Sequence, residues 1–508
     1  MKQLTAYSLQ LAEKTKRRIL HFLKAVSCQL QADNRGITVM LVLAFVGVFG
    51  LVLGTVASYS LMQSKYGRAL FAREQALHIA EAGLEFYRWF LVHNPSILID
   101  GTGLESPYNY SVDDPEGGTL GEAEVTATAN LQCGAVQWID IESRGTSNAN
   151  VSLPRTLSAR YMVPSVAEYS YLLNSSVWAG PDRNIRGPYH SNGGIRMDAT
   201  HNSDVTSAVA TWNCNSNYNC SPTQSNAPGV VGDGSNPALW TYPVPNVNFA
   251  AIGIDLADLE ERAEDEDGIH YDPASGSVNS RGYWLTFNAG GTVTIRRVTS
   301  TIGHPSYSSQ YGWGTEYSTI NNSTLVGTYA IPPDCSLLFF EDRVWVEGVV
   351  EGKVTIVAAT PNDSSTSPDA YLRGNITYAS SDGSDGLTLI AERNVLLPLT
   401  SPDEMEIHGI FVAQSGHYGR DFFTNSSSYP SSLRVGSTYS SYVLQSELTT
   451  VGTVVSNART GTAWSSGGNT ISGYQQRYDY YDQLLAFAPP PFTPIASTDY
   501  QFALWREQ

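Results

Sequence analysis

The stretch ITVMLVLAFVGVFGLVLGTVASYSLMQ, Ile37–Gln63, carries no charged residue. It exceeds the roughly 20 residues that an apolar helix needs to cross a bilayer. Seven basic and two acidic residues precede it, whereas the basic residues that follow closely are Lys65, Arg68 and Arg73. Because basic flanks stay on the cytoplasmic side, we expect the N-terminus in the cytoplasm and the remainder outside. A secretory signal has an apolar core of only about 7–15 residues, so the sequence predicts a single-pass helix in the inner (cytoplasmic) membrane.

The helical pattern continues beyond this apolar run. Apolar residues recur at spacings of seven, three, four, three and four: Leu70, Leu77, Ala80, Leu84, Tyr87 and Leu91. Such spacing puts them on one face of an α-helix. The helix is predicted to end before Asn94-Pro95, since the residue preceding a proline disfavours the α conformation. One helix from Ile37 to Val92 would be ~80 Å long at 1.5 Å per residue, with its first half in lipid and its second half against the body.

The N-terminal region resembles a type IV prepilin. A basic leader ends at Arg35-Gly36, the uncharged run follows, and EQALHIAEAGLEFYRW (Glu74–Trp89) is similar to the segment after the membrane span in PilX-like minor pilins. The resemblance implies that a prepilin peptidase cuts between Gly36 and Ile37 and that Ile37 is then N-methylated. It also implies association with the membrane and with other pilin-like subunits.

One position departs from the major pilins of that family. Their fifth mature residue is Glu, which pairs with the terminal amine of a neighbouring subunit and offsets the cost of burying both charges. Here that position is Leu41. PilX-like minor pilins and the tip pseudopilin of type II secretion also lack Glu at this position. The resemblance to them implies a subunit used in few copies rather than a repeating shaft subunit. The expected membrane and filament residues are Thr38, Leu41, Leu70, Leu77 and Leu84.

Composition favours β structure after the helix. Charged residues make up only 15% of the 508, while Gly (44) and Tyr (29) are abundant, a mixture that suits strands joined by polar turns. The whole chain carries −18 and residues 1–36 carry +5, so the remainder carries −23. Such an acidic body repels phosphate, and we expect no nucleic acid among its partners.

We predict an α+β, mainly β protein in six parts. These are a basic cytoplasmic leader (1–36), the transmembrane and amphipathic helix (37–93), a pilin-like α/β head (94–165), a loop-rich β region with one helix that Asp255 caps (166–330), a parallel β-helix-like region (331–460) and a Tyr- and Pro-rich strap (461–508). Gly348, Gly374 and Gly409 recur beside β-branched or aromatic residues, which favours a solenoid of stacked rungs. A β-sandwich is the alternative. The prolines of the strap predict an extended segment without regular strand pairing.

Four of the five cysteines follow the apolar run. Cys214 and Cys220 flank the short loop CNSNYNC and are predicted to close it with a disulfide. The same oxidising compartment would allow a second bond between Cys133 and Cys335. No pair has the spacing of a zinc site.

The sequence contains no specific catalytic constellation. It lacks a GxSxG elbow and a Walker A motif, which nucleophilic hydrolases and P-loop ATPases use. The acidic run 264–268 lacks the alternating ligands of a calcium loop. The neighbouring residues Asp182, His190, Asp198 and His201 are interpreted as hydrogen-bonded loop residues. We therefore predict no catalytic residue, metal or cofactor, and no enzymatic activity.

The predicted function is that of a minor pilin or pseudopilin-like component in filament assembly or tip-associated adhesion. One alternative is a permanently anchored surface adhesin whose β-helical domain binds a glycan or a protein. Aromatic, Asn-rich loops such as TWNCNSNYNC and SYSSQYGWGTEYST could supply such a surface. A tethered polysaccharide-active enzyme is a further alternative.

Overall fold

The computed structural model describes residues 37–252, 255–265, 268–363 and 365–508. The predicted leader, with Gly36 and Cys28, lies outside these residues. The first helix of the described residues, α2 (Ile37–His93), is continuous over 57 residues, as the sequence predicts. The chain divides into two compact units. One includes residues 37–75 and Asn148–Leu153, and the other contains Ala76–Ser147 and Pro154–Gln508.

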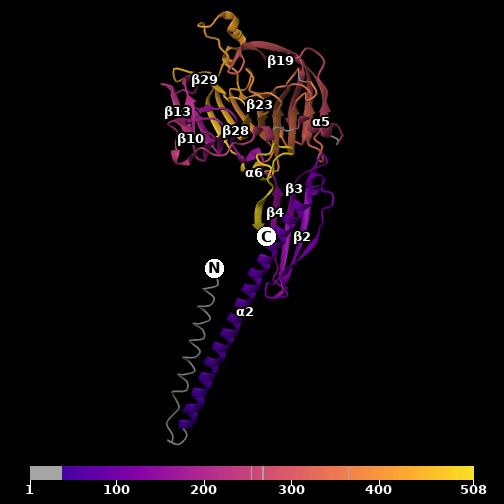
Figure 1. Cartoon of the computed structure of the whole chain (residues 1–508), viewed down its shortest axis with the longest axis vertical. Coiled ribbons are helices and arrows are strands. Elements are labelled where there is room, and N and C mark those ends of the chain that lie inside the picture. The colour runs from indigo at the N-terminus through magenta and orange to yellow at the C-terminus, as the bar shows by residue number, and fades with distance from the viewer. Residues whose placement is uncertain (1–36, 253–254, 266–267, 364) are drawn as a thin grey trace. The chain divides into compact units, whose positions relative to one another are not determined.

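A five-stranded antiparallel sheet follows the helix (Figure 1). Its strands, in spatial order, are β1 (Tyr108–Asp113), β2 (Thr119–Gln132), β3 (Ala135–Ser147), β4 (Arg155–Met162) and β31 (Gln501–Glu507). A short helix, α3 (Ile97–Asp100), precedes them. Buried and exposed residues alternate along β2 and β3, so one face of the sheet is apolar. The fifth strand comes from the C-terminus, a partner that the sequence analysis did not foresee.

A larger body holds three series of strands that pair in parallel. In the first series each strand pairs with the next: β16 (Ile269–Tyr271), β20 (Leu337–Phe340), β22 (Lys353–Ala358), β24 (Gly386–Ala391), β26 (Glu404–Ala413), β28 (Leu444–Ser456), β5 (Tyr171–Leu173), β8 (Tyr189–Ser191), β11 (Val205–Ser207) and β15 (Trp240–Thr241). The second comprises β17 (Gly282–Asn288), β21 (Val344–Val350), β23 (Ala370–Tyr378), β25 (Val395–Leu396) and β27 (Tyr418–Gly419). The third continues from β28 through β30 (Asn469–Tyr480) and β7 (Arg183–Arg186) to β10 (Thr200–His201).

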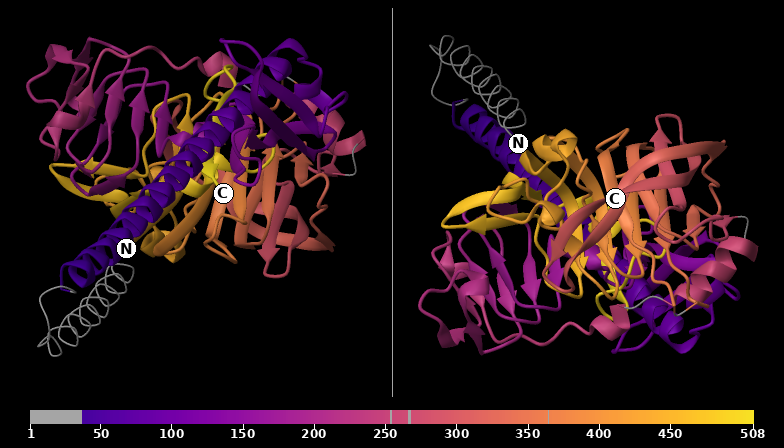
Figure 2. Two further views of the ribbon diagram at one scale, coloured as in Figure 1. Left: turned by 90° about the horizontal axis from the view of Figure 1, so that it is seen from below. Right: turned by 90° about the horizontal axis from the view of Figure 1, so that it is seen from above.

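Smaller elements complete the body. Three short strands pair in parallel, β6 (Val177–Ala179), β9 (Ile195–Met197) and β14 (Val230–Val231). The antiparallel pairs are β12 (Thr211–Cys214) with β13 (Gln224–Pro228), β17 with β18 (Thr292–Ser308), β18 with β19 (Gly312–Ala330), and β29 (Ala463–Ser466) with β30. The helices are α4 (Phe249–Ile252), α5 (Leu256–Asp265) and α6 (Gln483–Phe487), and 3-10 turns cover Val166–Glu168, Ser216–Tyr218, Pro237–Leu239, Ser431–Leu433 and Ser437–Tyr442. Figure 2 shows the strands of the body running side by side.

The parallel pairing extends beyond the region predicted for it. It does not stop at residues 331 and 460, because β5 and β8 belong to the first series, β17 to the second and β7 to the third. The tail also differs from the expected strap: β30 pairs with β28 and β31 pairs with β4. The proline-rich stretch around Pro489–Pro491 forms no strand, as expected, but it lies between these two strands. The prediction of an unpaired tail was therefore wrong for the segments on either side of it.

In-register stacking builds the core of the body. Leu338, Ile356, Leu389, Phe411 and Val454 are successive partners across five strands, and all five are buried in one cluster. On the opposite face of the same strands, a second buried cluster packs against α5 and α6 through Leu256, Leu259, Ala263 and Leu485. Strands buried on both faces are typical of parallel sheets. Asp255 caps α5, since its Oδ1 accepts hydrogen bonds from the amides of Ala257 and Asp258.

Gly409 and Gly452 mark a bend in the strands. They are register partners on β26 and β28, and both have positive φ, which side chains with a Cβ rarely adopt. Before Gly409, β26 pairs with β23, and after it β26 pairs with β24. The glycine therefore lets one strand take part in two of the parallel series.

Two disulfides occur among the described residues. Cys133 bonds Cys335 with Cα atoms 4.5 Å apart, and Cys214 bonds Cys220 with Cα atoms 5.6 Å apart. These are the two pairings named from the sequence. The first joins the turn after β2 to the segment before β20.

Candidate functional site

The first half of α2 presents an apolar surface that no other described part of the chain covers. Leu41 is 57% exposed, and Phe45, Leu51 and Met62 are exposed as well. Among the described residues, α2 is the one helix that is long and apolar enough to cross a membrane, and none of its apolar window is buried. Thr38 and Leu70 are also exposed. A contiguous apolar surface of this size in water is unfavourable and indicates contact with lipid or with other apolar helices.

The second half of α2 packs on the five-stranded sheet. Ala80, Leu84, Tyr87 and Leu91 are fully buried, and Leu77 is partly buried against them. Their partners are apolar residues of β2, β3 and β4: Val125, Ala127, Ile139, Ile141, Leu157, Ala159 and Tyr161. The apolar stripe predicted from the sequence is thus the packing face from Leu77 onward.

Glycine allows this helix and sheet to approach closely. A Cβ at Gly145 on β3 would overlap the backbone of Ala76 and Ala80, and a Cβ at Gly83 would overlap side chains of the sheet. Because backbone atoms cannot move aside like a flexible side chain, Gly145 sets the separation of helix and sheet.

A polar cavity of about 400 Å³ lies in the body. One wall is the tip of the β18–β19 hairpin, from Ser306 to Tyr317, and the other is formed by turns that precede β21, β23, β25 and β27. An isolated β-bridge between Tyr307 and Phe422 joins the hairpin to the segment that follows β27. The volume falls within the ~300–1,000 Å³ of small-ligand sites.

The turns place polar residues in register along one wall. Val344, Ala370, Val395 and Tyr418 are successive strand partners, so the residues before them occupy equivalent positions: Arg343, Asp369, Asn394 and His417. Asp369 Oδ1 accepts from the backbone and side-chain amides of Asn394 at 3.1 and 2.9 Å, and Asn394 Oδ1 accepts from the His417 amide at 2.9 Å. These bonds hold the wall in place.

The charges of the cavity divide into paired and unpaired groups. Arg281 pairs with Asp342 at 3.0 Å and Arg393 pairs with Asp369 at 2.6 Å. Asp421 accepts a hydrogen bond from Ser306 at 2.8 Å. Glu316, only 7% exposed, has no ion pair among the described residues. Burial, followed by the nearby charge of Asp421, raises the pKa of Glu316 to about 8.

Several buried polar atoms at the cavity have no hydrogen-bond partner within the described chain. They include the acceptor Oε2 of Glu316, Nδ1 of His417 and the donor Nε of Arg343. Burial lowers the pKa of His417, so its imidazole is neutral at pH 7 and offers one donor and one acceptor. Buried polar groups are normally hydrogen-bonded, so these atoms indicate a site for water or for a polar ligand.

One wall of this cavity comes from a stretch that stands out in the sequence, and the other wall does not. The aromatic stretch SYSSQYGWGTEYST is the hairpin tip, Ser306–Thr319. The opposite wall is formed by turns that lie up to about a hundred residues further along the chain. In the sequence, these turns are marked only by a polar residue immediately before each strand. Asp182, His190, Asp198 and His201 lie elsewhere and bind other partners, respectively Arg477, Thr206, Arg196 and Trp240.

Comparison with known proteins adds little to what the geometry of the site indicates. No family model and no curated protein matches the chain. Among solved structures, the crystal structure of the competence-associated pilin ComZ from Thermus thermophilus is similar over 86% of this chain and 97% of that chain, with 12% sequence identity and a TM-score of 0.32. A likeness at this level is too low to support an argument about fold or function.

Proposed function

We propose that this chain is a minor pilin-like or pseudopilin-like component of a type IV pilus or type II secretion-like system, used in few copies. The observation that carries the proposal is α2, whose first half is apolar and uncovered and whose second half packs on an antiparallel sheet. This arrangement matches what the resemblance of residues 35–89 to prepilins implies. The N-terminus would lie in the cytoplasm, with the sheet and the body outside.

The apolar half of α2 suits both a bilayer and a filament core. In lipid the helix satisfies its own backbone hydrogen bonds, and in a filament it would pack against equivalent helices of other subunits. Leu41 leaves no carboxylate to pair with a neighbouring N-terminus. A low-copy position at a filament end, where one of the two helix neighbours is missing, is consistent with that residue.

The body is proposed to be a solenoid. The parallel, in-register pairing of short strands in three series, with the bends at Gly409 and Gly452, is the pattern that stacked rungs produce. Each rung would bury its apolar face against its neighbours. Exported on α2, such a rod would present the hairpin and its cavity outside the cell.

Fractionation tests the filament proposal. Cells that express the full chain are sheared, and the filament and membrane fractions are probed for it. The proposal predicts a small amount of the chain in sheared filaments and the rest in the inner membrane. Leu41→Glu should increase the filament share, because it restores a partner for a terminal amine. Leu70→Glu, an acidic change at an exposed helix position, is the control and should not increase it. A chain found only in membranes, with and without L41E, would contradict the proposal and favour a permanently anchored adhesin.

The cavity favours a second function, adhesion through a saccharide. A sugar hydroxyl both donates and accepts, so it can satisfy the unpartnered oxygen of Glu316 and the unpartnered nitrogens of Arg343 and His417. Tyr311, exposed at the cavity, offers an aromatic face of the kind that packs on sugar rings.

Binding of the detergent-solubilised full chain to an array of mono- and oligosaccharides tests this function. We expect a hit that Glu316→Gln weakens about two- to tenfold, since the amide cannot reproduce the O–H donor of the protonated carboxyl, and one hydrogen bond between neutral groups contributes ~0.5–1.5 kcal/mol. Glu406→Gln is the matched control, because this exposed carboxylate lies on β26 and does not line the cavity. An array without hits, or equal losses in both variants, would remove the saccharide assignment and leave a water-filled cavity.

A further inference from the structure

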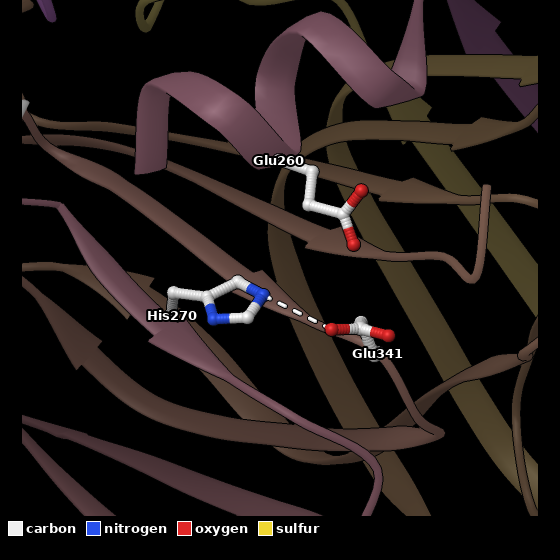
Figure 3. Close-up of side chains that lie close together, drawn as sticks. All are labelled: Glu260, His270 and Glu341. Carbon is white, nitrogen blue, oxygen red and sulfur yellow. Dashed lines mark ion pairs between the residues drawn. The ribbon is translucent and has the colours of Figure 1, made fainter. Parts of the chain in front are cut away.

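Three side chains with metal-ligating atoms converge beside α5. Glu260 comes from α5, His270 from β16, and Glu341 immediately follows β20. One ligand atom from each lies within 4.8 Å of the other two. Figure 3 shows the two carboxylates and the imidazole pointing toward a common space. Glu341 also lines the cavity described above, whereas Glu260 and His270 do not.

A further glutamate, outside the cluster of three, holds the His270 imidazole at the ring nitrogen that does not face Glu341. His270 Nδ1 lies 3.3 Å from Glu264 Oε1, and its Nε2 lies 3.2 Å from Glu341 Oε1. Nε2 is buried and makes no hydrogen bond among the described residues, and the His270 side chain is only 13% exposed. A histidine whose Nδ1 faces a carboxylate presents Nε2 as a ligand, an arrangement that recurs in metal sites.

The carboxylates are also positioned from outside the cluster. Glu260 Oε2 accepts a hydrogen bond of 2.8 Å from Asn362 Nδ2. Two carboxylates this close repel each other unless a cation or a proton lies between them. The arrangement therefore has an excess of acceptor atoms and a shortage of positive charge.

We propose that Glu260, His270 and Glu341 bind one divalent transition-metal ion, with zinc as the best-fitting member, and that Glu264 orients the imidazole. Imidazole nitrogen with carboxylate oxygen suits zinc or manganese better than calcium, which takes six to eight oxygen ligands. The ion joins α5 to β16 and β20. Because α5 covers apolar residues of β20, the metal fastens this helix to the end of the parallel series.

Zinc binding to the full chain in detergent tests the proposal. Equilibrium dialysis against ZnCl₂ with elemental analysis should give one zinc per chain. His270→Ala should remove it, and Glu264→Gln should weaken it about 10–100-fold, the usual effect of losing an outer partner. His408→Ala is the matched control, because His408 also pairs with a glutamate, Glu406, at 2.7 Å, but belongs to no cluster of three. It should bind zinc like the unaltered chain.

X-ray absorption on the zinc-loaded, unaltered chain keeps the test independent of variant folding. Ligands from this cluster give zinc–ligand distances of about 2.0–2.2 Å from nitrogen and oxygen, whereas a cysteine sulfur gives about 2.3 Å. A sulfur shell would place the metal on a thiol such as Cys28 and overturn the proposal. Absence of bound zinc, or equal zinc in H270A and the unaltered chain, would show that the cluster is an ion-pair network of a protonated histidine and carboxylates.

Discussion

Glu316 has the most unusual environment of the carboxylates discussed above. It is a buried residue of the hairpin tip, its Oε2 has no hydrogen-bond partner among the described residues, and its pKa is raised to about 8 mainly by the loss of solvent. At neutral pH the folded protein therefore holds a proton there that the unfolded chain has lost. Its neighbours include Asp421, Arg420 and Asp369, so a bound ligand would change the balance of charge as well as the hydrogen bonding.

The stability of the body should fall as pH rises from about 4.5 to about 8. In this window the folded state binds more protons at Glu316 than the unfolded state, so unfolding becomes easier as pH increases. At ~1.4 kcal/mol per pKa unit, the loss is on the order of a few kcal/mol. Thermal melting between pH 5 and 9 should show this slope, and Glu316→Gln should flatten it. A slope unchanged in E316Q would contradict the assignment.

Local pattern predicted some residues well and others poorly. Asp255 as a helix cap and the buried Leu256, Leu259 and Ala263 follow from a short sequence window. Glu316 and His417 gave no such signal, because their burial depends on a hairpin that folds over turns far away in sequence. The cluster at His270 was missed for the same reason, since Glu341 lies beyond the whole β18–β19 hairpin.

Among the elements, helix α2 has almost the same first and last residues as the helix predicted from the sequence. Its uncharged run and its apolar stripe are both local, and Asn94-Pro95 ends it. The antiparallel sheet beside it could be predicted only in part. Buried and exposed residues alternate along β2, a local pattern typical of a half-buried strand, but no local feature shows that residues 501–507 supply the fifth strand, because that pairing joins segments about 340 residues apart.

Gly145 should be essential for the packing of α2 on the sheet. In Gly145→Ala the new methyl group meets helix backbone, and we expect a loss of about 1–3 kcal/mol in stability, as for other overpacked sites. Limited proteolysis between β3 and β4 should accelerate accordingly. Gly461→Ala is the control, because a Cβ there has open space. Equal protease resistance of G145A and G461A would show that helix and sheet are not closely packed.

At the scale of the molecule, the order of strands in space differs from their order in the chain. β28 is followed in its series by β5, some 280 residues earlier in sequence. Recurring glycines suggested stacked strands after residue 331, yet no single-sequence signal predicts that 171–207 continues the same series. The Cys133–Cys335 bond, with a sequence separation of 202, is consistent with folding in an oxidising compartment outside the cytoplasm.

If the chain is a pilin-like subunit, its N-terminus is processed before the chain is used, and the mass of the mature N-terminal peptide shows whether it is. The peptide should be isolated from membranes or sheared filaments of cells that contain a prepilin peptidase. We expect a chain that begins at N-methylated Ile37. An intact N-terminus beginning at Met1 would contradict it, and would leave an anchored surface protein whose function lies in the cavity of its body.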